Sequence, residues 1–336
     1  MKRTLAFVLS ALLFAVAAGS LLSQYTPQPQ SAAASQRAKK FTIQRTPARL
    51  ARGKYLVHYV ADCFGCHSQV DWKNTVMPIP GTEGGGGEIP DDNLPFKVYP
   101  PNISPDPETG AGNWTDDQFI RALRQGIGND GRTLMPFMPY LIFRNMSDED
   151  LYSIIVYIRS IPPVRHKVPL TAWPKQVTDH WKPLPPLSAP ILSPDSSNPV
   201  KRGDYLVNAL ADCSGCHTPV NAVLEPLPGL NFSGGLMLHG PWGKVSSANL
   251  TPDPSGIIHY DEKMFLQTVR TGKVGGVRPL NNIMPWQHFR HMTDADLKAI
   301  FAYLRSLKPV QHRVDNTEPL TNCKLCRGLH GYGDRN

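Results

Sequence analysis

The feature that most constrains this chain is a ten-residue pattern that occurs twice, 150 positions apart. It reads ADCFGCHSQV at 61–70 and ADCSGCHTPV at 211–220, so each copy holds Cys, two spacers, Cys and His. The likeness extends further, because MSDEDLYSIIVYIRSIPPV at 146–164 matches MTDADLKAIFAYLRSLKPV at 292–310. The offset is 146 in this later part, so the second copy is four residues shorter in between. Internal similarity of this extent predicts two homologous domains.

The repeat divides the chain into five parts. Residues 1–40 precede the first domain, 45–166 and 199–314 form the two domains, 167–198 connect them, and 315–336 form a C-terminal tail. The connection holds seven prolines, so we expect it to be extended and semi-rigid rather than helical. Such a connection would limit the separations that the two domains can adopt.

Each domain is expected to hold three helices. In the first domain they run from about Arg49 to Cys63, from the N-cap Thr115 to Gly126, and onward from the N-cap Ser147; the first and last recur from Val200 and Thr293. A glycine inside the first helix costs about 1 kcal/mol, so Gly53 and Gly203 predict a close crossing by another helix. No segment alternates like a strand. The predicted fold class is all-α.

Residues 1–24 have the character of an export signal. Lys2 and Arg3 precede an apolar run at residues 5–22, and AVA at 15–17 is a candidate cleavage site. A cleaved signal and a retained membrane anchor both fit, because the run reaches the lower limit of a spanning helix; a buried soluble helix is the third alternative. The positive-inside rule places the rest of the chain outside the cytoplasm. We expect a periplasmic protein, either released or anchored to the outer face of the membrane by residues 5–22.

The positive charge of the chain belongs to its N-terminal segment. The formal net charge is +8, and residues 1–40 contribute five Lys/Arg and no Asp/Glu. By the same count, residues 41–170 carry net −1 and residues 195–315 carry net +2. Nucleic-acid binding needs a basic patch on a folded face. This distribution therefore argues against a nucleic-acid partner.

The pattern C-x-x-C-H is the attachment motif of c-type haem. Its two thiols lie on one side of a helix end, and once they are bonded to the haem the following His ring falls over the iron. Three other interpretations of the motif fit less well. A redox dithiol belongs with a strand–helix pattern, which is absent, and a disulfide needs no His. Zinc needs two further ligands, and none lies at zinc-like spacing. We therefore predict two covalently bound haem c, attached through Cys63 and Cys66 and through Cys213 and Cys216, with His67 and His217 as iron ligands.

Several motifs resemble those of the cytochrome c superfamily. YLVxxxADCxxCH, NISPDPETGAGNW, ALRQGIGNDGRTLMPFMPY and MSDEDLYSIIVYIRS are most similar to multihaem cytochrome c subunits of bacterial membrane-associated dehydrogenases for alcohols, aldehydes or sugar acids. The resemblance covers about 45–314 and implies two tandem class I-like domains. It also implies helix crossings at Gly53 with Tyr157 and at Gly203 with Tyr303, and haem propionates wrapped by the loop ending at Trp114, where the second domain has Tyr260 instead.

A haem iron in an electron carrier takes a second axial ligand, commonly Met or His. Met138 aligns without a gap to Met284, whereas Met135 aligns to Asn281, so Met138 and Met284 are the expected ligands. A proline follows each and keeps the chain extended. Met146 and Met292 precede helix N-caps, where packing explains them better. The remaining histidines are expected at the surface, and His288 is the main competitor of Met284.

A third C-x-x-C pair, Cys323 and Cys326, has Arg327 in place of the His. Too little chain follows Cys323 to build another haem domain. A disulfide or a free thiol pair, a metal site and a contact with a partner are the alternatives for this pair. His330 lies too far along the chain to act as a proximal haem ligand.

Two six-coordinate haems leave no site for a substrate, which favours an electron-transfer protein over an enzyme. The expected partners are a donor dehydrogenase or quinol-oxidising complex and an acceptor oxidase or cytochrome. The alternative is a dihaem enzyme such as a cytochrome c peroxidase, which needs one open haem. Thiosulfate-oxidising dihaem enzymes use a distal Cys, but all six Cys here lie in C-x-x-C pairs. A purely structural module is the third alternative.

Overall fold

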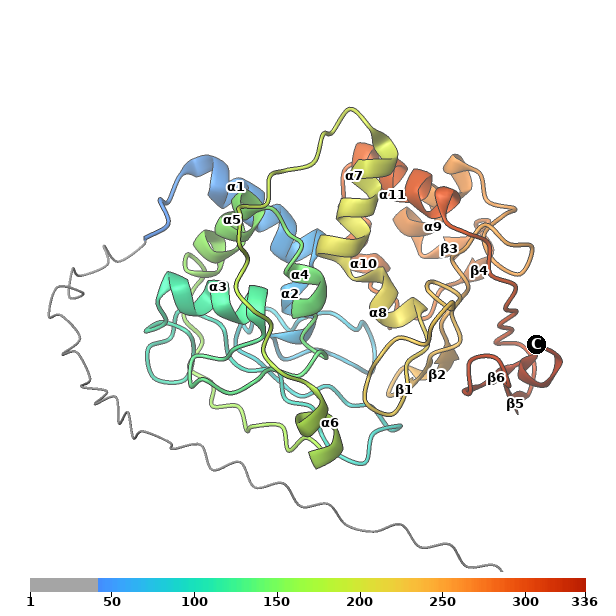
Figure 1. Ribbon diagram of the computed structural model, residues 1–336, viewed down its shortest axis with the longest axis horizontal. Helices are drawn as coiled ribbons and strands as arrows, with labels where there is room; N and C mark the ends of the chain where they lie inside the picture. Colours follow the sequence, from blue (N-terminus) through green and yellow to red (C-terminus); the bar gives the residue numbers. More distant parts are fainter. Residues whose placement is uncertain (1–41) are drawn as a thin grey trace, which may run out of the picture. The chain divides into compact units, whose positions relative to one another are not determined.

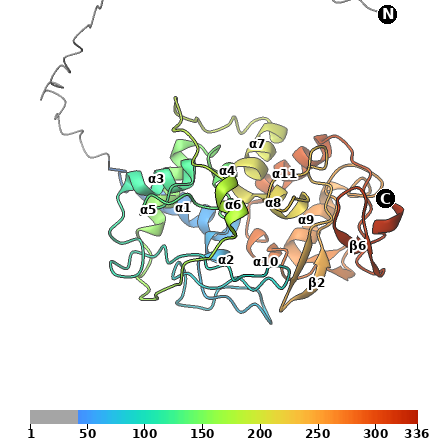
Figure 2. The ribbon, with the colours of Figure 1, turned by 60° about the horizontal axis from the view of Figure 1, so that its bottom comes forward.

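The computed structural model describes residues 42–336, in which each repeat is built around three main helices (Figures 1 and 2). The first repeat holds α1 (Pro47–Tyr55), the π-helical turn η2 (Leu56–Val60), α2 (Cys63–Cys66), α3 (Asp116–Gln125), α4 (Tyr140–Phe143) and α5 (Asp148–Ile158). The second holds α7 (Pro199–Tyr205), the π-helical turn η3 (Leu206–Ala211), α8 (Cys213–His217), α9 (Glu262–Thr271), α10 (Trp286–Phe289) and α11 (Asp294–Ser306). The predicted export segment lies outside the described residues.

Three short antiparallel hairpins accompany the helices in the described part of the chain. They pair β1 (Met237–Gly240) with β2 (Gly243–Ser246), β3 (Lys273–Val274) with β4 (Arg278–Pro279), and β5 (Leu320–Asn322) with β6 (Leu329–Gly331). These strands are two to four residues long, which is too short for an alternating pattern to be visible in the sequence. The fold is mostly helical, and the all-α class is confirmed.

The helix ends follow the predicted caps. The Thr115 side chain accepts a hydrogen bond from the Gln118 N–H, and the Gln118 side-chain oxygen accepts one from the Thr115 N–H, which completes a capping box. Gly126 ends the same helix at φ 68°. Ser147 caps α5 through the Asp150 N–H. The Asp150 carboxylate does not close a second box, because it contacts other helices.

The first and last helices of each repeat cross at a glycine, as the resemblance implied. A Cβ atom placed on Gly53 would lie 2.6 Å from the Tyr157 Cβ, and one on Gly203 would lie 2.7 Å from the Tyr303 Cβ. It would also overlap the backbone carbonyl of Ser153 or Ala299. Neither position has room for a side chain. The close approach of the helices therefore requires glycine, although glycine destabilises a helix relative to alanine.

The connection between the repeats is less extended than predicted. It contains the short helix α6 (Lys175–His180), which begins after Pro174. The Trp181 indole N–H anchors the end of this helix by donating to the Val223 carbonyl at 2.7 Å. The connection is also fixed to the first repeat, because the Leu184 N–H donates to the Gln125 carbonyl at 2.9 Å. Its conformation is therefore held by tertiary contacts rather than by proline stiffness alone.

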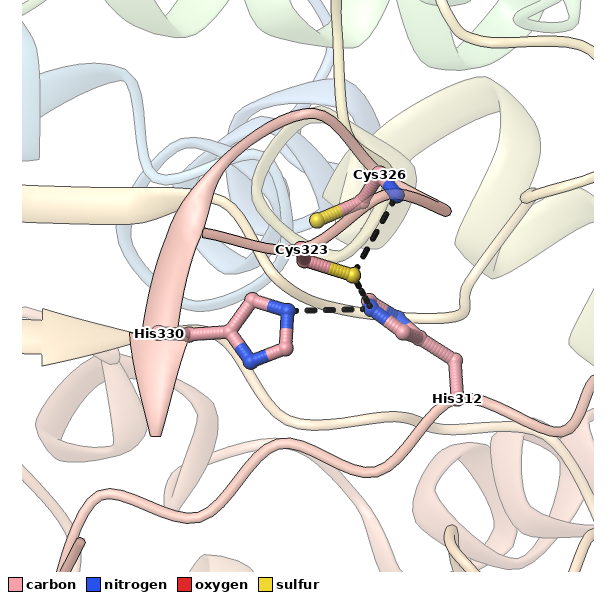
Figure 3. Close-up of side chains that lie close together, drawn as sticks. All are labelled: His312, Cys323, Cys326 and His330. Atoms are coloured by element: carbon pink, nitrogen blue, oxygen red, sulfur yellow. Dashed lines mark hydrogen bonds between the residues drawn. The ribbon is translucent and has the colours of Figure 1, made fainter. Parts of the chain in front are cut away.

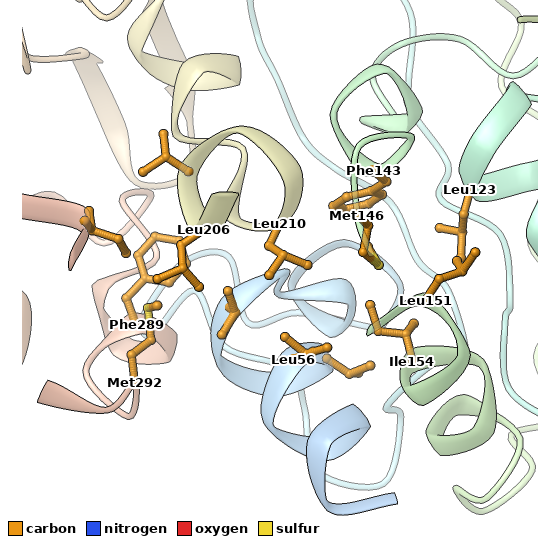
Figure 4. Packing of buried hydrophobic residues seen from close by; sticks show 14 of the residues in the cluster. Leu56, Leu123, Phe143, Met146, Leu151, Ile154, Leu206, Leu210, Phe289 and Met292 are labelled. Atoms are coloured by element: carbon orange, nitrogen blue, oxygen red, sulfur yellow. The ribbon is translucent and has the colours of Figure 1, made fainter. Parts of the chain in front are cut away.

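One hydrophobic core runs through both repeats (Figure 4). Leu56 of η2 and Leu206 and Leu210 of η3 are fully buried in it, beside Met146 and Met292. The placement of both methionines agrees with their predicted packing role. Because the two repeats share a core, residues 42–336 form one compact unit.

A reciprocal pair of tyrosines reinforces this shared core. The Tyr55 hydroxyl of the first repeat donates to Asp296 of the second at 2.6 Å, and the Tyr205 hydroxyl of the second donates to Asp150 of the first at 2.7 Å. Each aspartate is also paired with an arginine of its own repeat, Arg202 or Arg52. Two equivalent polar contacts thus join the repeats around a pseudo-twofold relation.

In residues 42–336, none of the helices has the length and apolar character that a membrane span requires.

Candidate haem sites

Both C-x-x-C-H motifs are positioned by an aspartate in a left-handed backbone conformation. Asp62 has φ 46° and Asp212 has φ 47°, which is uncommon outside glycine but tolerated by Asp. Each side chain caps the short helix that follows, accepting from the Gly65 N–H at 3.2 Å or the Gly215 N–H at 3.1 Å. A π-helical turn precedes each aspartate, so the backbone enters the motif in the same way in both repeats. The motifs therefore begin from matching, preset turns.

The two motif histidines are held in the state that a metal ligand needs. The Nδ1–H of His67 donates to the Pro101 carbonyl at 2.8 Å, and that of His217 donates to the Ala248 carbonyl at 2.7 Å. A carbonyl only accepts, so the proton lies on Nδ1 and Nε2 keeps its lone pair. Burial lowers the pKa of both rings. Both are therefore neutral at neutral pH, with Nε2 ready to bind iron.

The motif cysteines differ in exposure within each pair. Burial raises the pKa of Cys63, Cys66, Cys213 and Cys216 to about 12. Cys66 and Cys216 are nevertheless solvent-exposed, and Cys63 and Cys213 are half-buried. The second thiol of each motif is therefore the more accessible one.

The two motifs are also close to each other. Cys63 and Cys213 both pack against the shared hydrophobic core. His288 of the second repeat also lies 3.0 Å from a carboxylate oxygen of Asp62, which caps the first motif. The predicted attachment points in the two repeats therefore lie near the boundary that the repeats share.

The predicted axial methionines lie in equivalent turns. Met138 and Met284 are half-buried against the shared core, and the backbone N–H of each donates to the residue three positions earlier, at 3.0 and 3.1 Å. A short helix follows each, α4 or α10, with the intervening proline as its N-cap. Met135, by contrast, is only 5% exposed. Met138 and Met284 remain the predicted ligands.

Trp114 and Tyr260 occupy related but different surroundings. Both rings are half-buried against the shared core. The Trp114 carbonyl accepts from the Arg159 guanidinium at 2.5 Å, whereas the equivalent Arg305 donates to the Ile258 carbonyl at 2.8 Å. The loop that ends at Trp114 in the first repeat and at Tyr260 in the second therefore contacts the last helix differently in the two repeats. A role for either ring beside a haem propionate stays a prediction.

His288 is not at the surface, which corrects the expectation for this residue. It is 7% exposed, and its Nδ1 lies 3.0 Å from an Asp62 carboxylate oxygen and 3.1 Å from the His58 carbonyl. Burial alone lowers the pKa of His288, but the hydrogen bond and charge of Asp62 outweigh it and raise the pKa. His288 of the second repeat therefore contacts the cap of the first repeat's motif.

His312 and His330 were also expected at the surface, and this is wrong as well. Both are completely buried. They lie with Cys323 and Cys326 in one cluster of buried side chains. Sequence reasoning missed this cluster because His312 belongs to the second repeat, whereas the other three residues belong to the tail. The signal in the sequence was the third C-x-x-C pair, for which a metal site was one of the alternatives, but nothing in the sequence joined either histidine to it.

Two matching C-x-x-C-H turns in tandem helical repeats, each with a neutral imidazole whose Nε2 is free to bind iron, define a c-type cytochrome with two haem sites. The Cytochrome c family model matches residues 50–162 and 200–308. The chain belongs to the cytochrome c family, and its cofactors are two covalently bound haem c.

Curated relatives agree with this assignment. The chain is 33% identical over 275 residues to the fructose dehydrogenase cytochrome subunit of Gluconobacter japonicus, covering 77% of this chain and 52% of the relative. It is 30% identical over 322 residues to the alcohol dehydrogenase (quinone) cytochrome c subunit of Komagataeibacter europaeus, covering 90% and 61%. It is 26% identical over 265 residues to a "Diheme cytochrome c-type" protein of Cereibacter sphaeroides, covering 76% and 85%. The chain thus spans only about half to three-fifths of the two dehydrogenase subunits.

Proposed function

We propose that this protein is a dihaem electron carrier that links a membrane-associated dehydrogenase or quinol-oxidising complex to a downstream oxidase or cytochrome. The observation that carries the proposal is that both attachment motifs belong to one unit, in which Cys63 and Cys213 pack against the same hydrophobic core and His288 of the second repeat contacts Asp62 beside the first motif. Electron transfer between cofactors requires a short and fixed separation. The shared core and the reciprocal Tyr–Asp contacts supply the fixed separation.

Each haem c, when bound, supplies an iron centre that changes its charge by one electron. The residues of the chain attach and orient it. In the first repeat Cys63 and Cys66 would hold the haem covalently, and His67 and Met138 would bind its iron. In the second repeat the same roles belong to Cys213, Cys216, His217 and Met284. The Pro101 and Ala248 carbonyls fix the two imidazole planes and increase the basicity of Nε2.

The partners follow from the relatives and from the N-terminal segment. Two of the relatives are named as cytochrome subunits of fructose and alcohol dehydrogenases. By analogy, the donor is a dehydrogenase at the outer face of the cytoplasmic membrane. Residues 5–22 direct the chain to that side, either as a cleaved signal or as an anchor. The haem domains then act in the periplasm.

Rapid mixing with a dehydrogenase-containing membrane fraction tests the carrier role. We expect the oxidised holoprotein to be reduced at both haems, with low-spin spectra in both oxidation states and no turnover with peroxide. A high-spin signal in the resting protein, together with peroxide-dependent oxidation of a small donor, would instead establish a peroxidase. A pyridine haemochrome assay that gives one or three haems per chain would contradict the attachment scheme.

Two matched variants test the axial ligand. Met138→Ala should abolish the weak absorption band that Met–iron ligation produces at the red end of the spectrum of the first haem. Met135→Ala should leave that band in place, because Met135 aligns with Asn281 in the second repeat. Since Met ligation raises the reduction potential, Met138→Ala should also lower the potential of one haem only. Loss of the band in Met135→Ala would show that the gap-free alignment of the repeats is misleading.

A further inference from the structure

Two cysteines and two histidines converge in the C-terminal part of the chain, and none of the four belongs to a haem motif (Figure 3). Cys323 follows β5 directly, Cys326 lies in the turn, and His330 lies on β6, where it pairs with Thr321. His312 comes from the segment after α11. Both thiols are 3% exposed and both imidazoles 0% exposed. The four possible ligand atoms all lie within 4.8 Å of one another.

The hydrogen bonds of the two imidazoles fix which nitrogen faces the cluster. The Nδ1–H of His312 donates to the Ser233 carbonyl at 3.0 Å, and the Nδ1–H of His330 donates to the Gly331 carbonyl at 2.9 Å. Since carbonyls only accept, both protons are on Nδ1. The two Nε2 atoms then present lone pairs to each other at a separation of 3.1 Å. Two buried lone pairs repel at that distance, unless a cation or a proton lies between them.

Two of the separations are close to those of a tetrahedral metal site. Zinc binds imidazole nitrogen at about 2.0–2.1 Å and thiolate at about 2.3 Å, so tetrahedral ligands should lie about 3.3–3.8 Å apart. The Nε2 atoms are 3.1 Å apart, and Cys323 Sγ lies 3.5 Å from His312 Nε2. Two thiolates and two imidazoles are also the ligand set that favours zinc over the harder cations. Two thiolates would neutralise a divalent charge in this buried place.

The backbone around the cluster is shaped to keep the thiols together. Arg327 has φ 60°, which turns the chain directly after the second cysteine, and the Cys326 N–H donates to Cys323 Sγ at 3.5 Å. Gly235 has φ 93°, and a Cβ there would lie 2.6 Å from the His312 ring and 3.2 Å from Cys326 Sγ. Amide donation to sulfur stabilises a thiolate. The surroundings thus stabilise an anionic sulfur at Cys323 beside two neutral imidazoles.

A comparison of the two repeats shows what the tail adds. His166 of the first repeat makes the same contact as His312, with its Nδ1 2.9 Å from the Gly85 carbonyl. Asn102 and Asn249 likewise donate to the carbonyls of His166 and His312. His166 is only half-buried and has no cysteine beside it among the described residues. The fold therefore provides an oriented imidazole in both repeats, and only the tail converts one into part of a four-ligand cluster.

We propose that His312, Cys323, Cys326 and His330 form a structural Zn²⁺ site that fastens the C-terminal tail to the second haem domain. Binding would displace the two thiol protons and use all four side chains, which closes the coordination sphere, as in structural zinc sites. The tail needs such a fastening because its apolar support is small. Leu230, Leu227 and Val310 are the apolar residues that pack with the two cysteines.

The metal content of the untagged holoprotein, purified in the presence of EDTA, tests the site. Elemental analysis should give about one zinc for every two haem irons, because a closed and buried site exchanges slowly. Absorption spectroscopy at the zinc K-edge should show two sulfur and two nitrogen neighbours. Haem iron does not interfere with this measurement, because the edge is specific to the element.

Variants separate the site from adventitious metal. Cys326→Ser and His330→Ala should each reduce zinc to about zero per chain while both haems are retained, which shows that the haem domains still fold. His166→Ala, the equivalent position in the first repeat, should keep the full zinc content. Limited proteolysis should cut the tail within residues 315–336 faster in Cys326→Ser than in His166→Ala.

Several outcomes would overturn the proposal. One is a Cys323–Cys326 disulfide, seen as two alkylatable thiols only after reduction of the denatured protein. Another is stoichiometric copper, or iron in excess of haem, in place of zinc. Zinc that survives in Cys326→Ser, or that is absent from the unsubstituted protein, would be equally decisive.

Discussion

The Tyr55–Asp296 and Tyr205–Asp150 contacts make the two haem domains one unit, and removing the hydroxyls should uncouple them. In Tyr205→Phe the ring stays in place, so packing is unchanged. The Asp150 carboxylate loses a donor at 2.7 Å, and the buried Ser147 loses the acceptor of its N–H at 3.0 Å. A hydrogen bond to a charged group contributes about 1.5–3 kcal/mol, and a buried unpaired donor costs about 1–3 kcal/mol.

Because Arg52 still pairs with Asp150, the aspartate is not left without a partner. We therefore expect Tyr205→Phe to lower the free energy of unfolding by about 2–4 kcal/mol, a large share of the roughly 5–15 kcal/mol of a typical domain. Tyr55→Phe should have a similar effect, since Tyr55 makes the same contacts with Asp296 and the Thr293 N–H. The double variant should show the two repeats unfolding separately.

Urea unfolding of the holoprotein, followed by far-UV circular dichroism and by haem absorbance, measures this effect. Coincident transitions indicate one cooperative unit, and separated transitions indicate uncoupled repeats. Tyr303→Phe is the matched control, because its hydroxyl accepts from Asn208 at 2.6 Å within one repeat. The control should cost about 1 kcal/mol and keep the transitions coincident. If Tyr205→Phe behaves like Tyr303→Phe, the cross-repeat contacts are not what couples the domains.

Two further predictions concern packing and pH. Gly53→Ala should lower the free energy of unfolding by about 1–3 kcal/mol in urea, because the added Cβ would overlap the Ser153 carbonyl and crowd Tyr157. The better helix propensity of alanine offsets only about 1 kcal/mol of this cost. A more stable variant would show that the helices separate readily. Thr317 and Arg313 depress the pKa of Asp315 from 3.8 to about 2, so the ionised carboxylate contributes stability above pH 4 that is lost as pH falls toward 2. Hydrogen exchange of the β5–β6 hairpin should show this acid-dependent loss of protection, and Asp315→Asn should abolish it.

The elements that the sequence predicted well are those specified by local chemistry. Thr115 and Ser147 can cap a helix without reference to the rest of the fold, and both do so. The C-x-x-C-H motifs are equally local, because the spacing itself places the thiols and the imidazole on one turn. The Gly53 crossing was also predictable, since a glycine inside a helix needs a packing reason. In each case the cause lies within a few residues of its effect.

The elements that were missed depend on distant partners. The α6 helix forms because Trp181 meets the Val223 carbonyl, 42 positions away. His288 is buried because it meets Asp62 of the other repeat. His312 is indistinguishable in sequence from a surface residue until the tail folds back over it. No local pattern encodes such encounters, so they become visible only with the tertiary structure.

The interface between the repeats nevertheless has a simple origin in the duplication. A pair of similar domains packed around a pseudo-twofold relation forms each contact twice, as in a symmetric dimer. One useful pairing, a tyrosine of the first helix with the aspartate of the last, thus appears at both Tyr55–Asp296 and Tyr205–Asp150. Each aspartate lies three residues after an N-cap. Its backbone N–H donates to the N-cap side chain, and its carboxylate pairs with an arginine of its own repeat and accepts from a tyrosine of the other repeat. A substitution that removes the charge of Asp150 should therefore disturb both repeats, although the residue belongs to only one.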